Sequence, residues 1–225
     1  MDTGNETLRF NMVEQQIRPW DVLDQRILDL LMRMRREDFV PEAYRGLAFV
    51  DMEIPLGALG DLGDGAVMWP PRLEGRAVQS LDIQPNERVL EVGTGTGFVT
   101  ALLAHLAAEV VSVEIDPERA ASAAALLAAH GLTHVQVRVG DAAQDWAQDG
   151  TFDAILLTGS VPILPEALLG RLNPGGRLFA IVGEAPIMVA QRVTAIGADT
   201  YHAENLFDTI AAPLRNAVGP SRFVF

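Results

Sequence analysis

The residues with the clearest chemical potential form a glycine-rich segment, EVGTGTG, which follows an apolar run and precedes a helical pattern. Gly93, Gly95 and Gly97 allow the backbone to turn tightly and to approach a ligand closely. A helix that begins just after them offers N–H groups that have no partner within the helix. The third glycine comes one residue too early for the G-x-G-x-x-G pattern of dinucleotide sites, because Phe98 holds that position. The segment therefore predicts a loop that cradles a small ligand.

Two carboxylates stand at the ends of the next two predicted strands. Glu114 ends the first of these strands, where a carboxylate can accept hydrogen bonds from both ribose hydroxyls. Asp141 follows the second strand in the segment VGDA and can accept a hydrogen bond from an adenine amino group. Either acid alone is typical of an ordinary loop residue. The glycine-rich segment and the two acids together predict a site for a nucleoside-containing cofactor. The pattern resembles the S-adenosylmethionine site of Rossmann-like methyltransferases.

The elements that must position these residues alternate between strand and helix. The pattern predicts strands at 88–92, 110–114, 135–139, 152–157 and 177–182, and helices at 98–108, 117–130 and 165–172. Such alternation predicts an α/β fold with a Rossmann-like, doubly wound, mainly parallel sheet. We expect residues 1–80 to form an N-terminal helical extension with a substrate-side loop. Residues 81–225 then form the cofactor-binding domain, ending in a pair of strands after residue 186, and the whole is one compact unit.

Composition narrows the possible partners. A net charge of −13 and a pI near 4.6 repel phosphate backbones, so we expect no nucleic-acid partner. The sequence has no run of about 20 apolar residues and no secretory signal at its start, so we expect no membrane association and a cytoplasmic location.

The chain has no cysteine, and its four histidines lack ligand spacing, which predicts no metal site. Arg33, Arg35 and Arg36 are interpreted as a solvated helix face.

Several segments together resemble one family of methyltransferases. From about Ile27 to Gly183 the chain is similar to protein-L-isoaspartate O-methyltransferases, in the order MRREDFVP, IPLG, NERVLEVGTGTGF, VGDAAQDW, FDAILLTGS, LPEALLGRLNPGGRL. The helical RREDFVP and the FDAILLTGS segment are the more specific part of this resemblance. It implies a class I methyltransferase that methylates the free carboxylate of L-isoaspartyl residues in damaged proteins and releases S-adenosylhomocysteine.

The resemblance also implies roles for individual residues. The methionine part of the cofactor would be held by Glu91, Gly93, Thr94, Gly95 and Gly97. The adenosine part would be held by Glu114 at the ribose, Ile115 against the adenine, and Asp141 with Ala142 at the adenine edge. Thr158, after the fourth strand of the domain, would face the reaction cleft. No catalytic residue is assigned, because a carboxylate acceptor needs no base to remove a proton before it attacks the methyl group.

The segment just before the cofactor domain departs from this family. Its members usually carry a G-Q-T-I-S-Q-P-like segment whose hydroxyls help to hold substrate and cofactor, whereas GAVMWPP stands here. Val67 takes the threonine position and Trp69 the serine position; a shift of one residue puts Met68 at the serine. We therefore count Val67, Met68, Trp69 and Thr158 as substrate-side residues.

Three functions remain open at this point. The protein could methylate isoaspartyl proteins or peptides through other groups, or it could methylate a different, more apolar small-molecule acceptor. It could also bind the cofactor without catalysis. Trp69 has a plainer alternative too, because it could pack the N-terminal helices onto the sheet. The sequence leaves the oligomeric state open.

Overall fold

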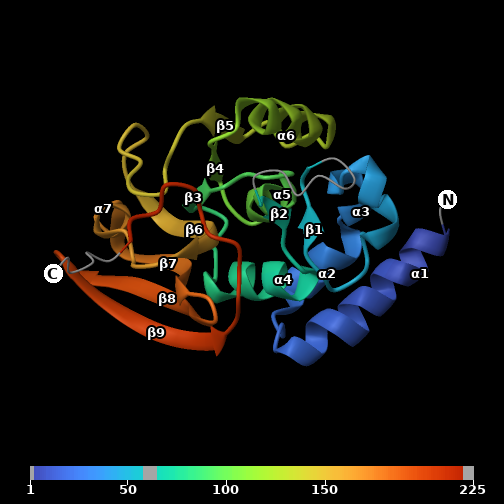
Figure 1. Ribbon diagram of the computed structural model, residues 1–225, viewed down its shortest axis with the longest axis horizontal. Coiled ribbons are helices and arrows are strands. Elements are labelled where there is room, and N and C mark those ends of the chain that lie inside the picture. The colour runs from blue at the N-terminus through green and yellow to red at the C-terminus, as the bar shows by residue number, and fades with distance from the viewer. Residues whose placement is uncertain (1–2, 58–64, 220–225) are drawn as a thin grey trace, which may run out of the picture.

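The computed structural model describes residues 3–57 and 65–219, and its centre is a seven-stranded sheet (Figure 1). The strands are β3 (Arg88–Val92), β4 (Glu109–Glu114), β5 (Val135–Val139), β6 (Phe152–Val161), β7 (Leu172–Glu184), β8 (Ile187–Gly197) and β9 (Thr200–Asp208). Their order across the sheet is β5-β4-β3-β6-β7-β8-β9. The first five in that order run parallel, and β8 and β9 add antiparallel strands at one edge. The predicted mainly parallel α/β sheet and its terminal strand pair are confirmed.

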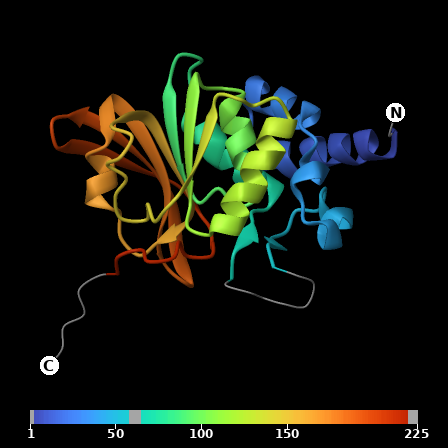
Figure 2. The same cartoon turned by 90° about the horizontal axis from the view of Figure 1, so that it is seen from above.

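The two faces of the sheet carry unequal helical layers (Figure 2). The helices are α1 (Thr3–Met12), α2 (Gln25–Arg33), α3 (Arg36–Phe39), α4 (Pro71–Ser80), α5 (Phe98–Ala104), α6 (Pro117–Ala129) and α7 (Glu166–Leu169). One buried cluster joins residues of α1 to α6 to one face, and a second cluster joins α7 and the loop around Trp146 to the other. The long helices therefore lie on one side, and short segments cover the other.

Capping residues in the sequence explain where two of the helices, α2 and α6, begin. Asp24 caps α2 by accepting the Arg26 N–H at 2.8 Å. Asp116 caps α6 by accepting the N–H groups of Glu118 and Arg119 at 2.9 and 3.0 Å, and Pro117 occupies the first helical position. Both caps satisfy N–H groups that have no partner inside the helix.

The N-terminal third wraps around α4 and the sheet. Besides α1 to α3 it contains a π-helical turn at Val13–Ile17 and 3-10 turns at Arg18–Trp20 and Glu42–Leu47. A short antiparallel pair, β1 (Ile54–Pro55) with β2 (Val67–Met68), was not predicted, and it brings the GAVMWPP segment beside the carboxyl ends of the parallel strands. Part of the predicted substrate-side loop, residues 58–64, lies outside the described residues. The division into residues 1–80 and 81–225 stays a prediction.

Two predicted helices are shorter than expected. The helix predicted over 98–108 ends at Ala104, because the chain must turn back to start β4 at Glu109. The helix predicted over 165–172 is only α7, because Gly170 takes its C-cap position and Leu172 already pairs with β6. No helix in the described ranges 3–57 and 65–219 is long and apolar enough to cross a membrane. The cytoplasmic location stays a prediction.

Candidate active site

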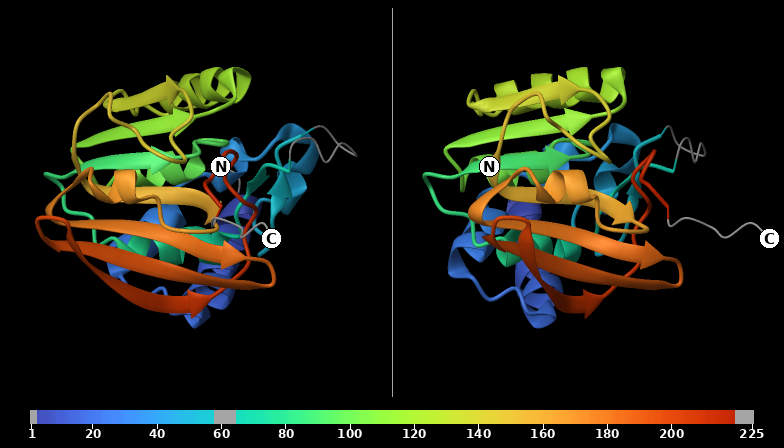
Figure 3. Two further views of the ribbon diagram at one scale, coloured as in Figure 1. Left: turned by 60° about the vertical axis from the view of Figure 1, so that its left-hand side comes forward. Right: turned by 90° about the vertical axis from the view of Figure 1, so that its left-hand side faces the viewer.

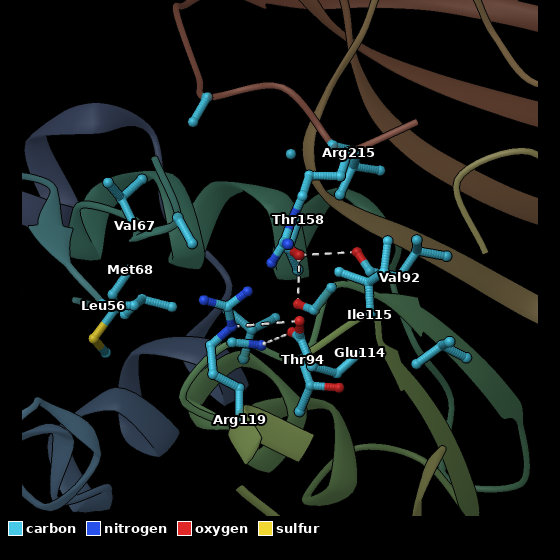
Figure 4. A pocket seen from close by; sticks show the side chains of 18 of the residues that line it. Leu56, Val67, Met68, Val92, Thr94, Glu114, Ile115, Arg119, Thr158 and Arg215 are labelled. Atoms are coloured by element: carbon cyan, nitrogen blue, oxygen red, sulfur yellow. Dashed lines mark hydrogen bonds and ion pairs between the residues drawn. The ribbon is translucent and has the colours of Figure 1, made fainter. Parts of the chain in front are cut away.

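A pocket opens at the point where the order of the parallel strands reverses. β3 has β4 on one side and β6 on the other, so the loops at their carboxyl ends diverge and leave a crevice. The pocket holds about 960 Å³ of empty space, including its open mouth. Figure 4 shows side chains from both halves of the chain around it. All predicted site residues line it except Glu91 and Gly97.

The glycine loop makes the tight backbone turn that its sequence predicted. Gly93, Gly95 and Gly97 have φ values of 97°, 54° and 85°, which a side chain disfavours. Thr158 lies within β6, which continues to Val161 past the predicted end at 157, and it donates its hydroxyl to the backbone oxygens of Val92 and Gly93, at 2.9 and 2.5 Å. The predicted cleft residue therefore also braces the loop.

Glu91 lies beneath the loop, fully buried at the end of β3. Its Oε2 accepts hydrogen bonds from the hydroxyls of Thr100 and Ser112, both at 2.5 Å, and Ser112 also lies 2.6 Å from the Thr94 hydroxyl. Among the described residues, its Oε1 has no hydrogen-bond partner. Burial raises the pKa of Glu91 to about 8, although both hydroxyls oppose the shift. The predicted contact with the cofactor stays a prediction, and the structure gives Glu91 a position under the loop.

Glu114 at the end of β4 is held in place by the two loops on either side of it. Its Oε2 accepts the Gly95 N–H at 2.9 Å, and its Oε1 accepts the Asp116 N–H at 3.0 Å and lies 3.4 Å from Arg119 Nε (Figure 4). A carboxylate has about four acceptor positions, so Oε2 keeps one for a ribose hydroxyl. The carboxylate is thus fixed toward the pocket before any ligand binds. Ile115, beside it, is half-buried in the pocket wall.

A segment after β9 crosses the carboxyl ends of the parallel strands, as the red chain in Figure 3 shows. It is fixed to β6 by the backbone of Ser160, whose N–H bonds to Ala212 and whose oxygen accepts the Leu214 N–H, both at 2.9 Å. Farther along, Asn216 donates its amide to Asp141 Oδ2 at 2.7 Å. We name this segment, residues 211–217, the strap. It ties the end of the chain to the predicted adenine-binding acid.

The predicted substrate-side residues differ in how far they reach the pocket. Val67 is half-buried, whereas Met68 and Trp69 are 5% and 3% exposed. The Trp69 ring packs edge-on against Phe179 of β7, with ring centroids 6.4 Å apart. The Trp69 ring therefore packs onto the sheet, as the plainer alternative for this residue expected. Leu56, which follows β1, adds to the apolar wall beside Val67.

The interpretation of Arg36 as part of a solvated face is wrong. Arg33 and Arg35 are exposed, but the Arg36 side chain is fully buried. Its Nε lies 2.9 Å from Glu74 Oε2, and its other nitrogens donate to the backbone oxygens of Ala48 and Trp69 at 2.6 and 2.7 Å. Burial raises the pKa of Glu74, and the Arg36 guanidinium opposes that shift.

Several other residues that line the pocket were not predicted as site residues. Among them are Leu56, Arg119, Leu214 and Arg215. Arg119 stands in the first turn of α6, and Leu214 and Arg215 belong to the strap. No cluster of three or more possible metal ligands occurs in the part of the chain that the structure describes.

Comparison with known proteins decides the family. A family model described as "Protein-L-isoaspartate(D-aspartate) O-methyltransferase" matches residues 8–217. The chain belongs to this family. Members of the protein-L-isoaspartate O-methyltransferase family use S-adenosylmethionine, so the predicted family, enzyme class and cofactor are confirmed.

Relatives in the family match over most of the chain. The protein-L-isoaspartate O-methyltransferase of Anaeromyxobacter dehalogenans strain 2CP-1 is 41% identical over 179 residues, covering 79% of this chain and 83% of that one. The same-named protein of Methylorubrum extorquens strain PA1 is 35% identical over 211 residues, covering 94% and 90%.

Solved structures share the fold. One named protein-L-isoaspartate O-methyltransferase has a TM-score of 0.80 at 20% identity, covering 95% of this chain and 67% of that one. A crystal structure from Plasmodium falciparum assigned to the same enzyme class, in complex with S-adenosyl-L-homocysteine, has a TM-score of 0.75 at 17% identity and covers 93% and 97%.

Proposed function

We propose that this protein transfers a methyl group from S-adenosylmethionine to the free carboxylate of L-isoaspartyl residues in proteins or peptides. One observation carries the proposal beyond family membership: a single pocket is lined both by the glycine loop with Glu114 and by the strand that replaces the family's substrate segment. Donor and acceptor can therefore meet in one site. We propose a cytoplasmic place of action, and neither a nucleic acid nor a membrane as partner.

The pocket residues fit the proposed cofactor. The backbone of Gly93 to Gly97 would hold its methionine part, since the glycines have no side chain and let the backbone approach a ligand closely. Glu114 would accept hydrogen bonds from the ribose with the acceptor position left on Oε2. Ile115 and Ala142 would contact the adenine, and Asp141 would accept a hydrogen bond from its amino group. These assignments remain proposals.

The chemistry suits the residues that are present. S-adenosylmethionine, when bound, supplies an electrophilic methyl group on a positively charged sulfur. The acceptor carboxylate is already a nucleophile, and no histidine lies among the described residues that line the pocket. The protein has to align the acceptor oxygen with the methyl group and exclude water, and such alignment alone can contribute on the order of 7–11 kcal/mol. Charge is lost along the reaction path, so apolar walls at Leu56 and Val67 do not oppose it.

A different acceptor is the second candidate, favoured by the apolar wall itself. Val67, Met68 and Trp69 bring no side-chain hydroxyl to the positions that carry them in the family. An apolar small molecule with one nucleophilic group would fit such a wall. Cofactor binding without methyl transfer is the third candidate. It predicts that the protein binds S-adenosylmethionine but methylates no acceptor.

One experiment separates these candidates. Methyl-labelled S-adenosylmethionine is incubated with an isoaspartyl peptide and, in parallel, with its normal aspartyl counterpart. Label in the isoaspartyl peptide alone supports the proposal, and equal labelling of both contradicts it. Tight binding of S-adenosylhomocysteine by calorimetry without any labelled peptide contradicts it as well, and a screen of small acceptors then separates the second candidate from the third.

A further inference from the structure

We propose that the buried pair Arg36–Glu74 is a positioning pair for methyl transfer: it holds the substrate-side strand β2 at a fixed place relative to the cofactor loop. The inference rests on the proposed function and extends it to Glu74, which lines the pocket, and to Arg36, which contacts lining residues from behind. Neither residue is assigned contact with the reacting atoms. Their effect passes through Trp69 and Phe98, which line the pocket.

The Arg36 side chain connects the pocket wall to the rest of the fold, because it donates hydrogen bonds to the backbone oxygens of two other segments. Its Nη2 donates to the Trp69 backbone oxygen at 2.7 Å, directly after β2, and its Nη1 donates to the Ala48 oxygen at 2.6 Å. Glu74 of α4 fixes the guanidinium plane, since Nε and Nη2 lie 2.9 and 3.3 Å from its two carboxylate oxygens. The planar, forked guanidinium suits several partners in fixed directions.

The same guanidinium also contacts the cofactor side. Arg36 Cζ lies 5.5 Å from the centroid of the Phe98 ring. Phe98 is the first residue of α5 and directly follows Gly97 of the glycine loop. One buried side chain therefore touches the element behind the acceptor and the element behind the methyl donor. A shift of the pair would change the distance between the two.

Stability alone is a weak reason for such a pair. A buried ion pair loses so much hydration that well-packed apolar residues often replace it at no cost in stability. The protein offers a matched comparison in Arg9–Glu37, whose Arg9 Nη2 and Glu37 Oε1 lie 2.6 Å apart and are also largely buried. Neither Arg9 nor Glu37 lines the pocket. A purely structural role predicts similar consequences for the two pairs.

The test replaces each pair by apolar residues. The pocket variant is Arg36→Met with Glu74→Leu, and the control is Arg9→Met with Glu37→Leu. Both variants are compared by thermal unfolding, by the Kd of S-adenosylhomocysteine, and by kcat and KM for an isoaspartyl peptide. Hydrogen exchange is measured at the amides of residues 65–69. We expect kcat of the pocket variant to fall about 10- to 100-fold, because misalignment of about 1 Å costs that much. Its Kd stays within about threefold, since the Glu114 contacts are intact.

Hydrogen exchange makes the test independent of the acceptor. We expect the amides of residues 65–69 to exchange faster in the pocket variant only. Equal kcat and equal exchange in the two variants would overturn the inference. If the wild-type enzyme labels no isoaspartyl peptide, the proposed function fails, and the exchange comparison still decides about the pair. Should the pocket variant not fold, Arg36→Lys replaces it in the same comparison: it keeps the charge but not the fork, so faster exchange supports the inference and unchanged exchange overturns it.

Discussion

The hydroxyl of Thr158 occupies the space that any side chain at position 93 would need. A Cβ built on Gly93 would collide with Thr158 Oγ1, while the same hydroxyl donates to the backbone oxygens of Val92 and Gly93. Thr158 of β6 thus holds Gly93, the residue after β3, in a conformation that only glycine adopts without strain. Two residues that are 65 positions apart in sequence share one small contact at the centre of the proposed cofactor site.

Replacement of Gly93 by alanine should disturb both stability and ligand binding. The residue has a φ of 97°, and the added methyl group would displace Thr158, so we expect a loss of about 1–3 kcal/mol in the free energy of unfolding. Binding of S-adenosylhomocysteine should weaken in the same variant. Denaturant unfolding and calorimetry measure the two effects. Gly46→Ala is the control, because nothing lies within 4 Å of its added Cβ. Identical behaviour of the two variants would contradict the proposed tight fit.

Replacement of Glu91 by glutamine should change how stability depends on pH. The raised pKa of Glu91, about 8 against an ordinary 4.5, means that the folded protein favours the protonated form. Its contribution is therefore complete below about pH 4.5 and is lost as the pH rises to about 8, with a slope of up to about 1.4 kcal/mol per unit. Glu91→Gln cannot ionise, so its unfolding free energy should decline less over this range.

The control for this effect is Glu118→Gln, which removes an exposed carboxylate from the first turn of α6. Its pH profile of unfolding should follow that of the wild-type protein. A wild-type profile that matches Glu91→Gln between pH 5 and 8 would show that Glu91 ionises without penalty.

Sequence patterns predicted the bounds of two strands of the sheet. The strands at 88–92 and 135–139 have the predicted bounds because β-branched residues recur in both and loop residues end them, although β3 is mostly buried and β5 is partly exposed. The sequence also predicted the glycine loop, because its role depends on local backbone conformation, and Glu114, because its role depends on its position at the end of a strand.

Other features depend on distant partners, which no local pattern reveals. Arg36 looked like a surface cation because its partners, Glu74 and the Trp69 oxygen, lie 38 and 33 residues away. The strand β2 has two residues, too few for a period to show. The short α7 was overestimated because the helical pattern continued past the capping Gly170.

Replacement of Glu114 by glutamine should weaken cofactor binding while leaving the fold intact. The amide keeps the shape but replaces one acceptor oxygen with a donor, and the Gly95 N–H or a ribose hydroxyl then loses its partner. We expect the Kd of S-adenosylhomocysteine to rise about 10- to 100-fold, since hydrogen bonds to a charged group contribute about 1.5–3 kcal/mol. Glu118→Gln, on the exposed side of the next helix, should bind with wild-type affinity. If both variants bind equally well, Glu114 does not hold the ribose.

Release of the strap should speed cofactor dissociation. Asn216 connects the strap to Asp141 through a 2.7 Å hydrogen bond and has a φ of 60°, so Asn216→Gly removes the side chain without adding backbone strain. We expect S-adenosylhomocysteine to dissociate about 2- to 10-fold faster in stopped-flow measurements, equivalent to the loss of about 0.5–1.5 kcal/mol. Asn216→Asp should have a larger effect, because a second carboxylate would then face Asp141. That additional effect should shrink at 0.5 M salt, since screening weakens repulsion between exposed charges. A dissociation rate unchanged in both variants would show that the strap does not control access to the adenine end of the pocket.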